Sequence, residues 1–212
     1  MITAIVGSGG KTTLLKAMAA QFRSEGKRVF VTTTTHMFIE PDTLLTDDAD
    51  VIIQALDETG YAMAGIPEGV KICALSPETY KAACAHADVV LVEADGSKHM
   101  PLKCPNATEP VIPGNADEII AVCGLNAIGQ KARDVCHRLD LVTARLGIGA
   151  DTIITAAHVQ QLVTEGYLLP LRKLHPDKEI RILPRQDGSA YQMQISRLLQ
   201  AEESIPEDLL LP

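Results

Sequence analysis

The chain has 212 residues, a formal net charge of −8 and only 3% aromatic residues, with no tryptophan. An acidic chain with few aromatic side chains lacks the basic face and the base-stacking surface that nucleic-acid binding requires. No apolar run approaches the ~18 residues of a membrane-spanning helix, and the apolar run at residues 2–6 is too short for a signal peptide. We expect a cytoplasmic protein with neither nucleic acid nor a membrane as its partner.

A glycine-rich turn joins the first predicted strand, 2–6, to the first predicted helix, 14–22. The residues of this turn are Gly7, Ser8, Gly9, Gly10, Lys11, Thr12 and Thr13. Glycines allow a backbone to wrap an anion, and the first amides of a helix are unpaired at the positive end of its dipole. We predict that the turn binds a nucleoside triphosphate, with Lys11 on the β- and γ-phosphates and the Thr12 hydroxyl on Mg²⁺. Lys11 is then expected to be solvated when no nucleotide is bound.

The turn departs from the standard phosphate-loop signature, G-x-x-x-x-G-K-[ST], because Ile5 stands where its first glycine belongs. The shorter form that begins at Gly7 resembles the ATP loop of the Mur ligases. The alternative interpretation is a glycine-rich turn in which Lys11 is only a solvated residue of the first helical turn.

The second predicted strand, 28–33, continues into Thr34, Thr35 and His36. Threonine favours strands, so β-propensity alone can explain this run. The carboxyl ends of parallel strands also face the ligand crevice, where hydroxyl groups can contact Mg²⁺ or a γ-phosphate. Both interpretations stay open, and Thr34 is a further candidate metal ligand.

A helix at 47–58, a strand at 70–75 and a helix at 77–87 are predicted next. The following apolar strand, 89–92, ends in Glu93 and Asp95, which is the pattern of a Walker B strand. Carboxylates at the end of a buried strand beside the phosphate loop can hold Mg²⁺ or orient a nucleophile. We predict catalytic and metal-binding roles for Glu93 and Asp95, without deciding which acid has which role.

A loop of more than twenty residues follows Gly96 and carries Lys98, Lys103 and Cys104. Long loops inside a domain are usually functional, so the two lysines are candidates for binding an anionic substrate; surface lysines on a proline-rich loop are the alternative. Nearby lysines would also make Cys104 a reactive thiol and a candidate covalent carrier of a transferred atom, although a packing role is favoured.

The remaining chain predicts strands at 118–123 and 179–183 and helices at 132–146, 155–165 and 188–201. Residues from about 125 to 175 are expected to form a helical cap or insertion. The stretch after the last strand matches the guanine-reading motif Asn-Lys-x-Asp only at Asp187, so ATP is favoured over GTP.

Several of these motifs together resemble the YqeC family. The resemblance is carried by residues 7–13, 32–35, 93–98, 101–103, 109–113 and 137–138. It implies an accessory protein of selenium-dependent molybdenum hydroxylases that helps to mature their labile selenium cofactor, with the hydroxylase or its maturation proteins as partners. The expected substrate-side residues are Lys98, Lys103, Glu109, His137 and Arg138.

The alternation of strands and helices predicts an α/β fold of the P-loop NTPase type, a mostly parallel sheet with helices on both faces, formed by residues 1–212 as one domain. The predicted function is a Mg²⁺-dependent NTPase or phosphoryl transferase in selenium cofactor maturation, with Lys11, Glu93 and Asp95 as catalytic residues. The alternatives are a nucleotide-gated chaperone or carrier and an ATP-dependent ligase.

Overall fold

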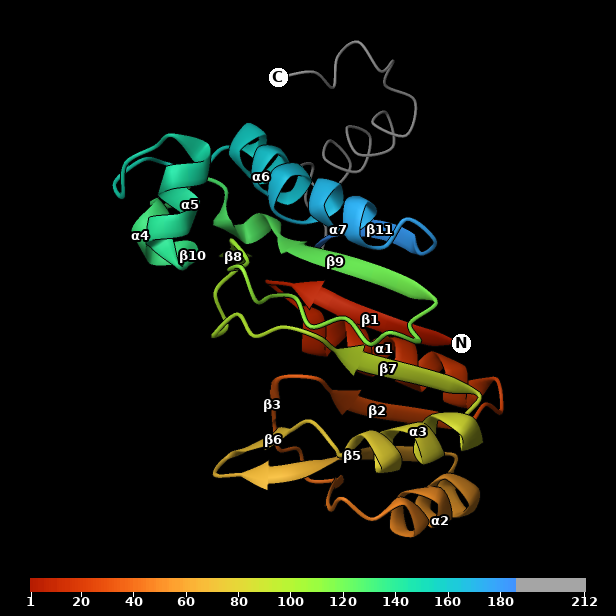
Figure 1. The fold of residues 1–212 in the computed structure, drawn as a ribbon. Helices are drawn as coiled ribbons and strands as arrows, with labels where there is room; N and C mark the ends of the chain where they lie inside the picture. The colour runs from red at the N-terminus through yellow and green to blue at the C-terminus, as the bar shows by residue number, and fades with distance from the viewer. Residues whose placement is uncertain (186–212) are drawn as a thin grey trace.

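The computed structural model describes residues 1–185, within which nine strands form one sheet in the order β11-β9-β1-β7-β2-β5-β6-β3, with β4 paired to β5. The strands are β1 (Ile2–Gly7), β2 (Val29–Thr33), β3 (His36–Phe38), β4 (Thr43–Leu45), β5 (Tyr61–Glu68), β6 (Lys71–Cys73), β7 (Val89–Glu93), β9 (Glu118–Gly124) and β11 (Glu179–Arg185). All pairings are parallel except those of β6 with β3 and β5. The parallel strands end at one edge of the sheet (Figure 1).

Helices cover both faces of the sheet. The helices outside the C-terminal region are α1 (Lys11–Ser24), α2 (Ala49–Thr59) and α3 (Pro77–His86). Alternate residues of the central strands pack on α1 on one face, and the intervening residues pack on α2 and α3 on the other. Because both faces are covered, every residue of β2, β7 and β9 is buried, as is typical of parallel strands. The α/β class with a mostly parallel sheet is confirmed.

Local capping explains where α2 and α3 begin. Asp48 accepts a hydrogen bond from the Asp50 amide (2.9 Å) at the start of α2. Ser76 accepts one from the Thr79 amide (3.4 Å) at the start of α3, where Pro77 occupies the first turn. Both side chains satisfy amides that have no partner within the helix, which is why the sequence located these helix starts well.

The region after β9 is mainly helical. Its elements are the short 3₁₀ turn η1 (Leu125–Ala127), α4 (Ala132–Val135), α5 (Leu139–Leu146), α6 (Ala156–Val163), the π-helical turn η2 (Thr164–Leu168) and α7 (Leu169–Leu174). Strands β8 (Leu102–Lys103) and β10 (Cys136–His137) pair here as a separate small sheet. A hydrophobic cluster joins α4, α5 and α6 to the end of β9, and α7 packs on the sheet face opposite α1. These helices lie beside β9 in Figure 1.

The sequence analysis missed one long strand and predicted one helix wrongly. Strand β5 was missed because its Ala-Met-Ala-Gly core has little intrinsic β-propensity; its pairing with β2, β4 and β6 stabilises it instead. The predicted helix 132–146 is broken at β10 and at Arg138, which has a left-handed backbone (φ 60°). The predicted helix 155–165 is confirmed as α6, which Thr155 caps and which continues beyond Val163 as η2. The predicted helix 188–201 and Asp187 lie outside the described residues. In the described part of the chain, no helix is long and apolar enough to cross a membrane.

Candidate functional site

The glycine-rich turn lies at the carboxyl end of β1 and rests on the end of β9. Gly7 has a φ of 91°, and a Cβ atom at this position would lie 2.1 Å from the Val122 carbonyl oxygen. Gly9 has a φ of 77°, and its Cβ atom would lie 2.5 Å from the Gly124 Cα. Both the backbone conformation and the close approach to β9 therefore require glycine.

The backbone amides of the turn at the start of α1 have no hydrogen-bond acceptor within residues 1–185. The first helical hydrogen bond of α1 runs from the Leu14 amide to the Gly10 carbonyl, and no side chain caps the helix. Within residues 1–185, no hydrogen-bond acceptor is found for the amides of residues 9–13. These amides border a cavity of about 340 Å³, which is within the usual ligand-pocket range of roughly 300–1,000 Å³. The positive end of the α1 dipole therefore borders this cavity.

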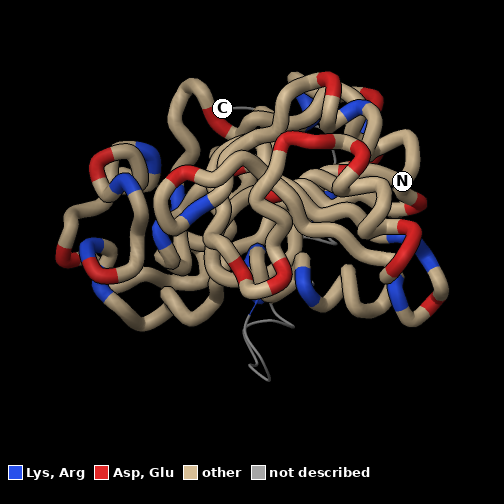
Figure 2. Tube along the Cα trace, turned by 90° about the horizontal axis from the view of Figure 1, so that it is seen from below, with Lys and Arg blue, Asp and Glu red and all other residues tan. Residues whose placement is uncertain are grey.

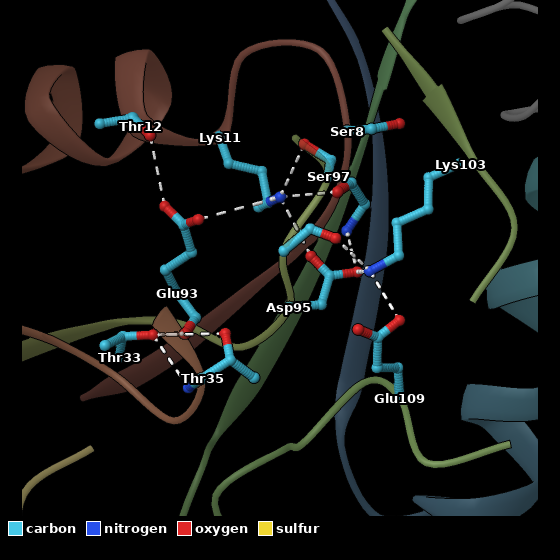
Figure 3. A network of polar contacts seen from close by, with 12 residues as sticks. Ser8, Lys11, Thr12, Thr33, Thr35, Glu93, Asp95, Ser97, Lys103 and Glu109 are labelled. Atoms are coloured by element: carbon cyan, nitrogen blue, oxygen red, sulfur yellow. Dashed lines mark hydrogen bonds and ion pairs between the residues drawn. The ribbon is translucent and has the colours of Figure 1, made fainter. Parts of the chain in front are cut away.

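Lys11 is buried in this structure, with 4% of its surface exposed, so the expectation that it is solvated was wrong. Its Nζ donates to the Gly7 carbonyl (2.7 Å) and lies 3.1 Å from Asp95 Oδ1 and 4.0 Å from Glu93 Oε1 (Figure 3). Ser97 Oγ is a weaker acceptor at 3.4 Å. The ammonium group therefore sits inside the loop, held by the two carboxylates that end the β7 region.

Thr12 and Glu93 form the pair best suited to a divalent cation. The Thr12 hydroxyl donates to Glu93 Oε2 across 3.3 Å, and both residues line the cavity. Mg²⁺ prefers hard oxygen ligands in an octahedron, whose adjacent oxygens lie about 3 Å apart for bonds of about 2.1 Å. Burial raises the pKa of Glu93, and Asp95 adds to this while Lys11 opposes it. The residues present fit a magnesium ion that Thr12 and Glu93 would share.

Asp95 occupies a different place from Glu93 and does not line this cavity. It is fully buried behind the loop, where Oδ2 accepts hydrogen bonds from the Gly7 amide (3.0 Å), Lys103 Nζ (3.1 Å) and the Tyr167 hydroxyl (3.2 Å). Its other oxygen faces Lys11. This position does not support the metal-ligand role predicted for Asp95, because Oδ2 already accepts three hydrogen bonds, and Oδ1, which has no hydrogen bond in the described chain, faces Lys11 rather than the cavity.

Three of the predicted substrate-side residues form a closed network with Asp95 instead of facing the cavity. Lys103 has no exposed side-chain surface and contacts the Gly96 carbonyl (2.6 Å) and Glu109 Oε2 (2.8 Å) as well as Asp95. Glu109 in turn forms a bidentate pair with Arg138. A Lys–Glu–Arg chain with both carboxylate oxygens occupied has little capacity left for a substrate.

The last two predicted substrate-side residues lie apart from each other. Lys98 is exposed and lines the cavity. His137 is partly buried in β10, paired in register with Lys103 of β8. Burial lowers the pKa of His137, and the charges of Arg138, Lys103 and Lys98 act in the same direction. His137 is thus disfavoured as a cation next to this network.

Protonating Glu109 should weaken the network. Burial opposes ionisation, but the bonds from Arg138 and Lys103 prevail and lower the pKa of Glu109 from 4.5 to about 2. Its contribution to stability is full above the unfolded-state pKa and is lost as the pH falls towards 2. Between pH 6 and pH 3, the wild type should lose more unfolding free energy than Glu109→Gln, measured by urea denaturation. Exposed Glu58 on α2 provides the control, because Glu58→Gln should lose as much unfolding free energy as the wild type. Equal losses in Glu109→Gln and the wild type would contradict the role of Glu109 in the network.

Two further predictions concern the hydroxyl run and Cys104. The Thr34 hydroxyl donates to the Val111 carbonyl (2.7 Å), so it ties the long loop to the end of β2 rather than pointing at the Thr12–Glu93 pair. Thr33 donates to the Glu93 carbonyl (2.7 Å) and supports the strand end.

Cys104 is 2% exposed and belongs to the hydrophobic cluster of the helical region. Its burial supports the packing role over the carrier role.

Two residues near the loop were not recognised as candidates from the sequence. Arg185 ends β11, and its Nε lies 3.6 Å from where a Cβ on Gly10 would be. Asn126 follows β9 and lines the same hollow as Gly10, Thr13 and Arg185. Arg185 makes no ion pair among the described residues. The available signal was that both residues follow strands at the carboxyl edge of the sheet, where ligands bind.

These features define an α/β protein with a phosphate-loop-like turn between its first strand and helix. The profile of the family described as "YqeC protein" matches residues 3–140. An Escherichia coli (strain K12) protein titled "Uncharacterized protein YqeC" is 30% identical over 227 residues, which cover 99% of this chain and 81% of that protein. The chain belongs to the YqeC family, which confirms the resemblance noted in the sequence.

A likeness to a solved structure is more distant. A chain of the MinC:MinD cell division protein complex of Aquifex aeolicus aligns with a TM-score of 0.46 and 11% sequence identity. The alignment covers 94% of this chain and 77% of the other. At this similarity the match carries no argument about function.

Proposed function

We propose that the protein binds a nucleoside triphosphate with Mg²⁺ and acts as an NTPase or phosphoryl transferase. The observation that supports this most is the row of amides at residues 9–13, which have no hydrogen-bond acceptor within residues 1–185 and whose residues border one cavity together with Glu93. Amides at a helix start bind phosphate, a lysine neutralises it, and paired hydroxyl and carboxylate oxygens hold the metal. The chemistry then needs positioning and charge stabilisation more than covalent participation by the protein.

Lys11 has to change partners for this function. Its ammonium group bonds to Gly7 and Asp95, and a bound phosphate would replace them. Asp95 would then keep the Gly7 amide, Lys103 and Tyr167 as donors. Because the carboxylate stays compensated, the exchange avoids leaving a buried charge unpaired. Bound Mg²⁺ would supply further neutralisation of the phosphate oxygens.

The nucleoside is best placed on the β9–β11 side of the loop. The cavity with Glu93 marks the end that holds the terminal phosphates, because Lys11 and Thr12 face it. The second hollow, bordered by Gly10, Thr13, Asn126 and Arg185, lacks these groups and lies next to the start of α1. Arg185 can contact a phosphate or stack on a base, and the Asn126 amide can hydrogen-bond a base edge. ATP remains favoured because the guanine-reading motif is degenerate.

A nucleotide-gated switch is the second candidate. It is favoured by the unbroken chain of contacts from Lys11 through Asp95, Lys103 and Glu109 to Arg138, at the start of α5. Movement of Lys11 towards a phosphate would therefore alter the contacts that connect this network to the helical region. Slow hydrolysis stimulated by a partner protein would favour the switch, whereas turnover that depends on a small substrate would favour a transferase or ligase. A role in selenium cofactor maturation, with a molybdenum hydroxylase as partner, follows from the resemblance described above.

Lys11→Ala tests the nucleotide site. The variant should lose measurable binding of ATP with Mg²⁺ in calorimetry, because it removes the cation that faces the β- and γ-phosphates. Lys11 also pairs with buried Asp95, so circular dichroism and thermal unfolding must show that the variant is folded at the assay temperature. Lys27→Ala, an exposed lysine just beyond the other end of α1, is the control and should bind ATP normally.

Unchanged ATP affinity in folded Lys11→Ala would refute the nucleotide site. The same variant also tests the pathway, when a selenium-dependent hydroxylase is matured in its presence with a selenium donor. We expect the hydroxylase to remain inactive after incubation with Lys11→Ala and to become active after incubation with Lys27→Ala. Full maturation with folded Lys11→Ala would refute a nucleotide-driven role in that process.

A further inference from the structure

The cavity beside the phosphate loop extends beyond the groups that a nucleotide and Mg²⁺ would use. Its far wall comes from β3 and β6, which carry Phe38 and Lys71, and its roof comes from Lys98 and His99 of the loop after β7. These four residues, here called the outer subsite, face the same space as Thr12 and Glu93. The outer subsite therefore borders the terminal-phosphate end of the site, and its His99 also lines the hollow that contains Arg185 and Asn126.

Two lysines of the outer subsite have no carboxylate partner within residues 1–185. Lys71 contacts the face of the Phe38 ring, with its Nζ 4.8 Å from the ring centroid, and Lys98 is exposed at the cavity. The acidic residues nearby already have partners: Glu40 pairs with Lys16 (2.9 Å) and Glu68 with His36 (2.7 Å). Among the charged residues that line the cavity within residues 1–185, Lys71 and Lys98 have no salt bridge, whereas Lys11, Glu40 and Glu93 each have one.

This positive charge is a local feature. Asp and Glu are interspersed with Lys and Arg over the molecule (Figure 2). Lys71 and Lys98 instead reach one cavity from separate elements, β6 and the loop after β7. Both lysines line one pocket without a carboxylate partner in the described chain, so each can donate a charge-assisted hydrogen bond to an oxyanion there.

An aromatic contact holds the roof and the wall together. The Phe38 and His99 rings are stacked, with centroids 5.0 Å apart and an interplanar angle of 25°. Lys98 and His99 both have left-handed backbones (φ 49° and 61°), a conformation that is uncommon for residues other than glycine. The stack with Phe38 keeps this turn over the cavity, so Lys98 is positioned by structure rather than by chance exposure.

We propose that the outer subsite binds a second small ligand, an oxyanion such as a phosphate ester or a carboxylate, between Lys71 and Lys98. The inference rests on the proposed nucleotide site, because it places this ligand next to the terminal phosphate. It also replaces the substrate-binding role expected for Lys103, Glu109 and Arg138, whose charges are satisfied among themselves. A small anionic second substrate fits a phosphoryl transferase or a ligase better than a protein that only hydrolyses nucleotide.

The test uses protein saturated with Mg²⁺ and a non-hydrolysable ATP analogue, so that the terminal-phosphate position is already filled. Orthophosphate and acetate are then titrated separately while amide ¹H–¹⁵N spectra are recorded. Shifts are expected in residues of β3, β6 and the loop after β7. For Lys71→Ala/Lys98→Ala, the affinity for the better-binding anion should fall by about tenfold or more, as loss of charge-assisted bonds predicts. The matched control Lys27→Ala/Lys81→Ala removes two exposed lysines elsewhere and should bind as the wild type does.

The possible results separate the two proposals. If the wild type does not bind the ATP analogue, the nucleotide site itself is refuted, irrespective of the anion titrations. If the analogue binds but neither anion shifts the outer subsite, or if both double variants bind the anion equally, the outer subsite is refuted. If Lys71→Ala/Lys98→Ala weakens the analogue and leaves the anion unaffected, the two lysines serve the triphosphate and the inference is also overturned. Preference for orthophosphate over acetate would identify the ligand class as a phosphate.

Discussion

Replacing Lys103 with methionine is expected to lower the free energy of unfolding by about 3–5 kcal/mol, the typical cost of removing one partner from a buried ion pair. Lys103 has no exposed side-chain surface and lies within 3.1 Å of Asp95 and 2.8 Å of Glu109. Methionine preserves most of the side-chain volume but removes one of the two cations beside the fully buried carboxylate of Asp95, leaving Lys11, and also removes a cation from Glu109. Urea denaturation of the wild type and the variant measures the difference.

An exposed ion pair on the same protein provides the control. Lys131 lies 3.2 Å from Asp151, and both side chains are more than half exposed. Lys131→Met should cost no more than about 1 kcal/mol, because water and salt screen such pairs. If Lys103→Met were as mild as Lys131→Met, the buried network would not be holding the phosphate loop, and Lys103 would be available for the substrate role first expected for it.

Glu93→Gln is expected to reduce kcat for ATP hydrolysis or transfer by at least about a hundredfold, because the amide keeps the shape but not the charge needed beside Thr12. Nucleotide binding should fall less, since the loop amides and Lys11 are unchanged. Burial raises the pKa of Glu93, and a bound divalent cation favours the ionised carboxylate that the variant cannot form. Phosphate release with saturating ATP and Mg²⁺ measures the effect.

The same assay separates the two acids at the end of β7. Asp95→Asn should act mainly through stability, since its oxygens contact the Gly7 amide, Lys103 and Tyr167 rather than the cavity. Glu58 is an exposed residue of α2, so Glu58→Gln is the control for removing a carboxylate and should turn over ATP at the wild-type rate. Near-normal turnover by Glu93→Gln would show that the acid beside Thr12 has no catalytic role.

The sequence by itself determined the parts of this protein that depend on neighbouring residues. The strand, glycine turn and helix around Gly7–Thr13 could be located from the sequence. An apolar run, closely spaced glycines and a helical pattern follow one another there within about twenty positions. The helix start at Ser76 was similarly local, because its side chain bonds to the amide three residues further along. The acid-ended strand at Glu93 was recognisable from its apolar run alone.

Only the tertiary structure decided what the polar residues do. Glu93 and Asp95 are two residues apart, yet one borders the cavity and the other is enclosed by Lys103 of the following loop and by Lys11 and Tyr167, which come from distant segments. Partners contributed by residues far apart in sequence leave no periodic signal. Strand β5 was hidden for the same reason, since its stability comes from pairing with β2 and β4 rather than from its own side chains. A charged side chain becomes a ligand contact or a structural contact according to the partners that the fold brings to it.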